Sequence, residues 1–277
     1  MSRSTEQADL PPFNSTAQFR QTLPPNPQWT FGQPVDATPA GKAWVAGEEA
    51  GWDVVDADTE DKMKLYALML SGIAPRPVAF VSTVSETGVE NLAPFSWFNM
   101  VTHHPPLISI SSGVRSTGDK DTAHNIKATR GFTVNIISET WIESANACSI
   151  ETPADVTEWP LSGLTKADSI YVKAPRVKES AFSMECELHQ AIDITDPDTG
   201  AHTTTLILGR VRRIHIRRDV LAPGPKRAVD PERMRAISRM GDITYARVGE
   251  GFRLSRPVWV EDKVREAVNS VASNATP

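Results

Sequence analysis

The sequence predicts a mainly β protein whose strands form a closed or partly open antiparallel barrel with peripheral helices. Short β-branched and apolar runs separated by turns follow residue 75. Two long runs of strand character, 181–195 and 203–217, flank the turn sequence DPDTG. Segments with a helical pattern are few, short and placed between strands. This combination is typical of a meander-type sheet and not of βαβ units.

Residues 1–60 differ from the rest of the chain. Prolines recur between positions 11 and 39, and they break regular elements. Trp29, Trp44 and Trp52 are costly to leave in water, and a disordered tail would be poor in aromatics. We expect an extended N-terminal arm that lies against the folded body or a partner subunit. The expected organisation is therefore an arm over 1–60, a barrel domain over 61–260, and a C-terminal helix and tail over 261–277.

The first elements predicted after the N-terminal arm are a helix and three strands. The pattern of residues 61–70 predicts a short amphipathic helix, stopped by Ser71-Gly72 and then Pro75. Strands are predicted over 76–85, 89–99 and 105–112.

A helix and a strand follow. Asp119 or Asp121 can cap a helix that runs to about Arg130 and ends at Gly131. Residues 132–137 then predict another strand.

The second half predicts mainly strands. A helical stretch is expected over 139–148 and a loop over 149–159, before strands at 169–177, 181–195 and 203–217. The last expected elements are a helix over 232–241, short strands over 243–248 and 251–255, and a helix over 261–274.

Composition argues against several functional classes. The 277 residues carry a formal net charge of −5, so a nucleic-acid partner is not expected. The arginines between 210 and 218 alternate with apolar residues, which favours a solvated strand edge. No apolar window is long enough to span a membrane, and the N-terminus lacks a signal-peptide pattern. We therefore expect a soluble cytoplasmic protein.

Familiar catalytic and metal motifs are missing from the sequence. Cys148 and Cys186 are far apart without metal-ligand spacing, which fits a reducing compartment. His103 and His104 precede two prolines and have no metal-like partner on a helix, so no metal site is expected. There is no Walker loop, G-x-G-x-x-G or G-x-S-x-G sequence.

The run GDKDTAHNI is the first candidate binding segment. The N-terminus of a helix presents unpaired N–H groups and a partial positive charge that suit a phosphate. Lys120 adds a cation and Thr122 a hydroxyl, and Ser111, Ser112 and Arg115 could complete the cradle. The alternative is a plain capped surface helix.

The run NLAPFSWFN is the second candidate. Its apolar side chains could face a flat ring, while Asn91, Ser96 and Asn99 offer hydrogen bonds, and N–H groups around Ala93 could face polar ring edges. The alternative is a half-buried strand with a proline-induced irregularity.

Taken in order, these segments resemble the flavin reductase-like FMN-binding family. The matching runs are RPVAFVST, NLAPFSWFN, PPLISIS, KDTAHNI and FTVNI, followed by GLT and SRMGDITYARV. The resemblance covers roughly residues 65–257. It implies an antiparallel split β-barrel that dimerises, with FMN near the subunit interface. Asp242 stands where a second glycine is more usual, beside the Arg239 and Tyr245 motif.

The resemblance also implies the site. The residues expected at the isoalloxazine end are Ser82, Thr83, Asn91, Leu92, Ala93, Pro94 and Ser96. The residues that it places at the phosphate end are Ser111, Lys120, Asp121, Thr122 and Asn125. Ser112 and Arg115, proposed above for the cradle, would join them there. No catalytic side chain is named, because the flavin carries the redox chemistry and the protein positions it.

Three functions remain open at this point. The first is an NAD(P)H-dependent flavin reductase, which could supply reduced FMN to a partner monooxygenase. The second is an enzyme that retains FMN and oxidises or reduces a small organic substrate, with the aromatic arm roofing the flavin. The third is a flavin-binding protein without turnover.

Overall fold

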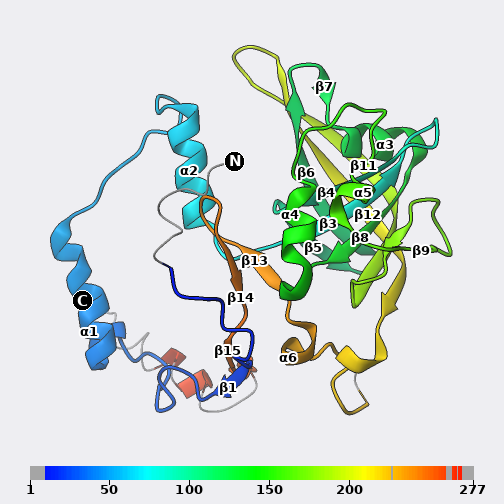
Figure 1. Cartoon of the computed structure of the whole chain (residues 1–277). Helices are drawn as coiled ribbons and strands as arrows, with labels where there is room; N and C mark the ends of the chain where they lie inside the picture. Colours follow the sequence, from blue (N-terminus) through cyan, green and yellow to red (C-terminus); the bar gives the residue numbers. More distant parts are fainter. Residues whose placement is uncertain (1–9, 226, 260–263, 267, 270–277) are drawn as a thin grey trace. The chain divides into compact units, whose positions relative to one another are not determined.

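The computed structural model describes residues 10–225, 227–259, 264–266 and 268–269, and they fall into two units (Figure 1). One unit is Tyr66–Val248. The other combines the chain up to Leu65 with the chain from Gly249.

The larger unit is built on one antiparallel sheet in the order β4-β3-β8-β11-β12-β6-β5. Its strands are β3 (Ala79–Val84), β4 (Glu90–Phe95), β5 (Phe98–His103), β6 (Pro106–Arg115), β8 (Gly131–Ile136), β11 (Phe182–Thr195) and β12 (His202–Ile216). A short strand, β7 (Gly118–Asp119), pairs with β6.

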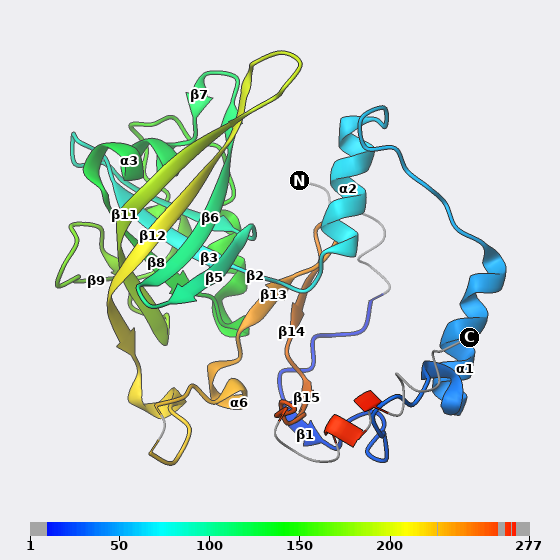
Figure 2. The same cartoon turned by 180° about the vertical axis from the view of Figure 1, so that it is seen from behind.

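The two edge strands of this sheet are neighbours along the chain. Only Ser96 and Trp97 separate the end of β4 from the start of β5. A two-residue link cannot span a flat sheet of this width, so the sheet curls until its edges meet. The result is a barrel left open between β4 and β5. Figure 2 shows the side of the barrel that β11, β12, β6 and β5 form. The predicted mainly β, antiparallel split barrel is confirmed.

The barrel interior is apolar. Val81, Ile110, Phe132 and Ile207 are at most 1% exposed and share one cluster. Ala123 and Ile126 of α3 (Asp121–Thr129) belong to the same cluster. Helix α3 is therefore anchored to the barrel by its apolar face, which fixes where its first turn lies.

A second apolar cluster packs on the opposite face of β3 and β4. Phe80 and Leu92 from these strands meet Trp141 and Trp159. Trp141 ends a 3-10 turn, η4 (Glu139–Trp141), which continues into α4 (Ile142–Ala147). Trp159 opens α5 (Trp159–Ser162), so the predicted helix over 139–148 and the loop before Trp159 agree with the structure.

The long hairpin β11–β12 confirms the predicted turn. Asp196 Oδ1 accepts hydrogen bonds from the N–H groups of Asp198 and Thr199, and Gly200 adopts a positive φ of 69°. Both features are the chemistry that a tight turn requires.

The predicted strand over 169–177 is wrong. Only β9 (Lys166–Ala167) and β10 (Arg176–Val177) are strands there, and a loop joins them. The N–H groups of residues 170–172 donate to the carboxylate of buried Glu185 on β11. Val177 N–H donates to Asn135 Oδ1 on β8. Side-chain oxygens therefore accept the hydrogen bonds of these backbone N–H groups, in place of the carbonyl groups of a neighbouring strand.

The predicted strand over 89–99 is two strands, β4 and β5. The chain bends at Ser96–Trp97 without a glycine, and the N–H of Ser111 donates to the carbonyl of Trp97 at 2.9 Å. Pairing with β6 thus starts a new strand where the sequence shows no turn residue.

The boundaries of α3 also differ from the prediction. Lys120 is the N-cap residue and makes no side-chain cap, so neither Asp119 nor Asp121 caps the helix. At the other end Arg130 adopts the left-handed conformation (φ 64°), and Gly131 already belongs to β8.

The predicted helix over 232–241 is mostly wrong. Helix α6 covers Pro231–Met234 and ends at Arg235, whose φ is 49°. The chain then forms β13 (Ile237–Arg239), which pairs with β14 (Tyr245–Arg247) and β2 (Arg76–Pro77). Another short turn, η5 (Arg218–Val220), follows β12.

Arg76 holds this small sheet together. Its buried guanidinium donates to the carbonyls of Leu70, Ile73 and Met240, and to Ser96 Oγ. The first two carbonyls lie at the end of α2 (Lys62–Gly72), so the helix predicted over 61–70 is present and two residues longer at its end.

The smaller unit corrects the expectation that residues 1–60 are extended throughout. It contains η2 (Val35–Ala37), α1 (Pro39–Val45) and η3 (Ala46–Ala50). Thr38 caps α1 by accepting the N–H of Gly41, and Pro39 occupies the first helical position, which proline tolerates. A parallel pair joins β1 (Arg20–Thr22) to β15 (Glu250–Phe252). The predicted helix over 261–274 lies largely outside the described residues.

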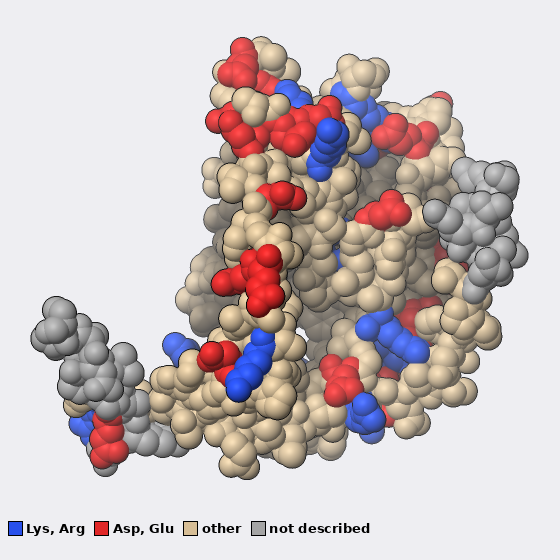
Figure 3. Space-filling model, turned by 90° about the vertical axis from the view of Figure 1, so that its left-hand side faces the viewer, with Lys and Arg blue, Asp and Glu red and all other residues tan. Residues whose placement is uncertain are grey.

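Acidic and basic side chains are interspersed on the face shown in Figure 3. Among the described residues, no helix has both the length and the apolarity needed to cross a membrane.

Candidate functional site

A cavity of about 200 Å³ lies beside the first turn of α3. It is lined by Asn91, Ala93, Pro94, Phe95, Arg115, Lys120, Asp121, Thr122, Cys148, Ser149, Ile150, Glu151 and Glu158. Both candidate segments of the sequence, NLAPF and KDT, therefore contribute to one cavity.

The first turn of α3 supplies hydrogen-bond donors. The first N–H groups of any helix lack partners within the helix, and the N-terminus carries a partial positive charge. No side chain caps α3. The end of the helix beside the cavity therefore suits an anion.

Two buried hydrogen bonds tie α3 to the strands beneath it. Asn91 Nδ2 donates to Thr122 Oγ1 at 2.9 Å, and Asn125 Nδ2 donates to Thr83 Oγ1 at 3.0 Å. All four residues are at most 7% exposed. These bonds fix the height of the helix against β3 and β4.

Arg115 presents an unused donor. Its terminal nitrogen pairs with Asp121 Oδ2 at 3.0 Å. Its Nε–H is buried and has no hydrogen-bond partner among the described residues. A buried N–H without a partner is costly. Arg115 lines the cavity, so its guanidinium is a candidate contact for an anionic ligand.

Lys120 is the second cation at the cavity. Its Nζ lies 3.3 Å from Glu151, and the two side chains are 38% and 64% exposed. Exposed ion pairs contribute little free energy, so an anionic ligand can replace Glu151 at small cost.

Glu158 is a cavity residue that the sequence did not indicate. It is 3% exposed, and its carboxylate accepts hydrogen bonds from the N–H of Leu92 at 2.9 Å and from Thr152 Oγ1. Glu158 lies 66 residues from Leu92 in the chain and in a segment that predicts only a loop. It fastens the 149–158 loop over β4, where Ser149, Ile150 and Glu151 join the lining.

Cys148 lines the same cavity. Burial, and to a smaller extent the nearby Glu158 carboxylate, raise the pKa of its thiol to about 12. The group therefore stays a protonated thiol near neutral pH and is not an activated nucleophile.

The remaining predicted residues do not line the cavity. Ser82, Thr83, Leu92, Ser112 and Asn125 are buried, with Leu92 in the outer apolar cluster. Ser96 Oγ accepts from Arg76, and Ser111 pairs with β12. The buried Ser82 Oγ has no partner among the described residues.

Comparison with known proteins identifies the family. The model of the flavin reductase like domain matches residues 71–231. The chain belongs to this family. An uncharacterized protein of Halalkalibacterium halodurans is 35% identical over 204 residues, which are 73% of this chain and 96% of that protein.

Two solved structures have the same barrel. Nitrilotriacetate monooxygenase component B from Bacillus cereus is 33% identical, with a TM-score of 0.70 over 74% of this chain and 99% of that one. A Shewanella frigidimarina protein described as a flavin reductase with a split barrel domain is 19% identical, with a TM-score of 0.62 over 76% of this chain and 100% of that one.

The family points to a flavin cofactor, and the cavity has donors that fit one. The unpartnered Nε–H of Arg115, the uncapped start of α3 and Lys120 suit the phosphate of a flavin nucleotide. Beside them, Ala93, Pro94 and Phe95 offer apolar surface.

Proposed function

We propose that this protein is an FMN-binding, NAD(P)H-dependent flavin reductase. The observation that carries the proposal is Arg115, which lines the cavity beside the start of α3 and has a buried Nε–H with no hydrogen-bond partner among the described residues. A phosphate there would accept from Arg115, from the first N–H groups of α3 and from Lys120. Riboflavin has no phosphate, so this geometry favours a flavin nucleotide such as FMN over riboflavin.

The ring of the flavin would lie along β4. The cavity of about 200 Å³ is smaller than typical cofactor pockets of about 300–1,000 Å³. It can hold the phosphate end, and the ring must extend beyond it past Ala93 and Pro94.

A second subunit would complete the ring site. Trp97, Met100 and Val101 follow β4 and are 43%, 65% and 50% exposed. A run of large apolar side chains on the surface marks an interaction face. We propose that this face forms a homodimer and covers the flavin.

The bound flavin would supply the redox chemistry by accepting a hydride from the nicotinamide. The chain's own residues would hold and orient it: Arg115 and Lys120 bind the phosphate, while Asn91 keeps α3 in place. The apolar surface at Phe95 excludes water from the ring end.

The test is anaerobic reduction of FMN by NADH or NADPH, followed by the loss of visible flavin absorbance. Catalytic bleaching of excess FMN supports the proposal, and absence of bleaching with both nicotinamides contradicts it. The Arg115→Met variant should weaken FMN binding about tenfold or more and leave riboflavin binding nearly unchanged.

The similarity to a monooxygenase component supports a further part of the proposal, that the reduced flavin passes to a partner monooxygenase. Mixing the protein with such an oxygenase should couple NAD(P)H oxidation to substrate hydroxylation.

A second candidate is an enzyme that retains FMN and acts on a small organic substrate. The smaller unit lies outside the matched residues 71–231 and has an open groove of about 550 Å³, lined mainly by apolar residues that include the exposed Val35, Trp44 and Trp52. That volume suits a small organic molecule. A purified protein that is yellow and keeps FMN through dialysis would favour this candidate, and a colourless protein would exclude it.

A further inference from the structure

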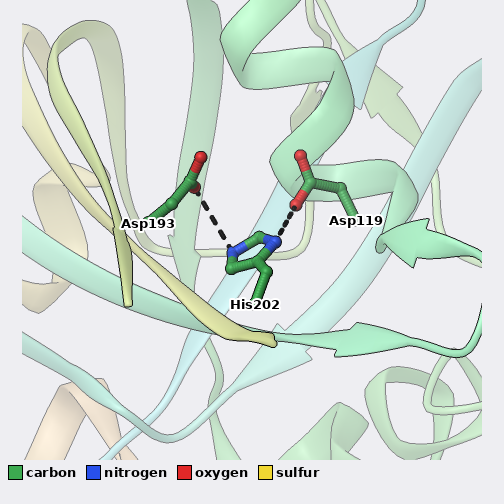
Figure 4. Close-up of side chains that lie close together, drawn as sticks. All are labelled: Asp119, Asp193 and His202. Carbon is green, nitrogen blue, oxygen red and sulfur yellow. Dashed lines mark ion pairs between the residues drawn. The ribbon is translucent and has the colours of Figure 1, made fainter. Parts of the chain in front are cut away.

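A cluster of four ionisable side chains lies next to the candidate phosphate site. Figure 4 shows the imidazole of His202 between the carboxylates of Asp119 and Asp193, at 3.7 Å and 3.4 Å. Lys127 Nζ bonds to the same two carboxylates, at 2.9 Å to Asp119 and 2.6 Å to Asp193. The fully buried Thr205 Oγ1 donates to Asp193 at 2.8 Å.

The cluster has its own cation. The ligand atoms of Asp119, Asp193 and His202 lie within 4.8 Å of one another, a spacing that could hold a metal ion. Lys127 Nζ, however, already bridges the two carboxylates. Its hydrogen bond lowers the pKa of Asp193, which keeps that group ionised. The ammonium group thus supplies the positive charge that a metal would bring, and the cluster acts as a four-way ionic contact.

The four residues come from four elements. Asp119 ends β7, Lys127 is in the last turn of α3, Asp193 is on β11 and His202 starts β12. Figures 1 and 2 show β7 and the tip of the β11–β12 hairpin extending from the same end of the barrel. The contact therefore joins the hairpin to the segment that enters α3.

That segment also forms the phosphate site. Asp119 directly precedes Lys120, the N-cap residue of α3, and Asp121 two residues later pairs with Arg115. Movement of Asp119 would shift Lys120, the first N–H groups of α3 and the partner of Arg115 together. The ring end of the cavity, at Ala93 and Pro94, belongs to β4. This strand contributes none of the four residues of the cluster.

We infer that Lys127, held between Asp119 and Asp193, is a positioning residue that sets the geometry of the phosphate site and so the preference for FMN over riboflavin. This inference rests on the proposed function. Without Lys127, two carboxylates would face each other across His202, and their repulsion would separate β7 from the hairpin.

The test compares the dissociation constants of FMN and riboflavin for the full chain and for Lys127→Met, by quenching of flavin fluorescence. FMN binding should weaken about three- to tenfold, while riboflavin binding should change by less than about twofold. Lys127→Arg keeps the charge and should restore most of the FMN affinity. Asp198→Asn, an exposed change at the tip of the same hairpin, is the matched control and should leave both constants unchanged.

A second variant tests the inference independently, in case Lys127→Met does not fold. Asp119→Asn leaves the Lys127–Asp193 pair in place and should weaken FMN binding in the same direction. If both variants fold, by circular dichroism, and keep the wild-type ratio of the two constants, the inference is overturned while the proposed function stands. If the wild-type chain binds neither flavin, the proposed function fails and the inference fails with it.

Discussion

Asn91 and Thr122 join the two halves of the candidate site. The amide of Asn91, on β4, donates to the hydroxyl of Thr122, in the first turn of α3, at 2.9 Å. The two residues are 7% and 2% exposed, so the bond is shielded from water. It places the strand expected beside the flavin ring at a fixed distance from the helix expected to bind the phosphate.

Asn91→Asp should weaken FMN binding about tenfold or more. The carboxylate cannot donate to Thr122, and it adds negative charge where an anion is proposed to bind. Fluorescence titration measures the effect. The control is Gln190→Glu, which adds the same charge at an exposed position of β11 that does not line the cavity. Equal affinities for wild type and Asn91→Asp would contradict a phosphate at this place.

Glu185→Gln should reduce stability at neutral pH but much less at pH 3. Burial raises the pKa of Glu185, but the N–H groups of residues 170–172 and the imidazole of His215 outweigh burial and hold it at about 2. A carboxyl whose pKa falls on folding stabilises the protein above its unfolded value of 4.5 and loses that contribution as the pH drops toward 2. The contribution at pH 7 is on the order of 3 kcal/mol.

Urea denaturation at pH 7 and pH 3 measures the difference between wild type and Glu185→Gln. Glu187→Gln changes a partly exposed carboxylate two residues along the same strand and should cost little stability. A difference for Glu185→Gln that is the same at both pH values would mean that the 170–172 loop does not depend on the ionised carboxylate.

These contacts show what the sequence could and could not predict. Strand periodicity and the Asp196–Gly200 turn chemistry are local, so the hairpin β11–β12 was predictable from them. The run 169–177 has the same periodicity, yet its N–H groups bond to Glu185, a partner that only the tertiary structure provides. Arg115 and Lys120 could be proposed as phosphate ligands from the sequence, because they lie next to the predicted start of a helix. Glu158 was not, because its contact with Leu92 crosses 66 residues without a local pattern.

Cys148 should resist thiol reagents at neutral pH although it lines the cavity. Burial and Glu158 keep its pKa at about 12, so almost no thiolate forms. Cys186 is fully buried, and burial likewise raises its pKa. A colorimetric thiol assay should therefore detect both cysteines only after denaturation. Rapid labelling of Cys148 in the native protein would show that the 149–158 loop opens.

Gly209→Ala should destabilise the barrel by about 1–3 kcal/mol. A Cβ at position 209, on β12, would lie 2.4 Å from Cζ of Phe132, whose ring is fully buried inside the barrel. Gly113→Ala on β6 is the matched control, since a Cβ there meets nothing within 4 Å. Phe132→Leu shortens the ring side chain, so the double variant should lose less stability than the two single losses added together. Urea denaturation of the four variants measures these losses. Strictly additive losses would show that the ring of Phe132 is not the reason that position 209 needs a glycine.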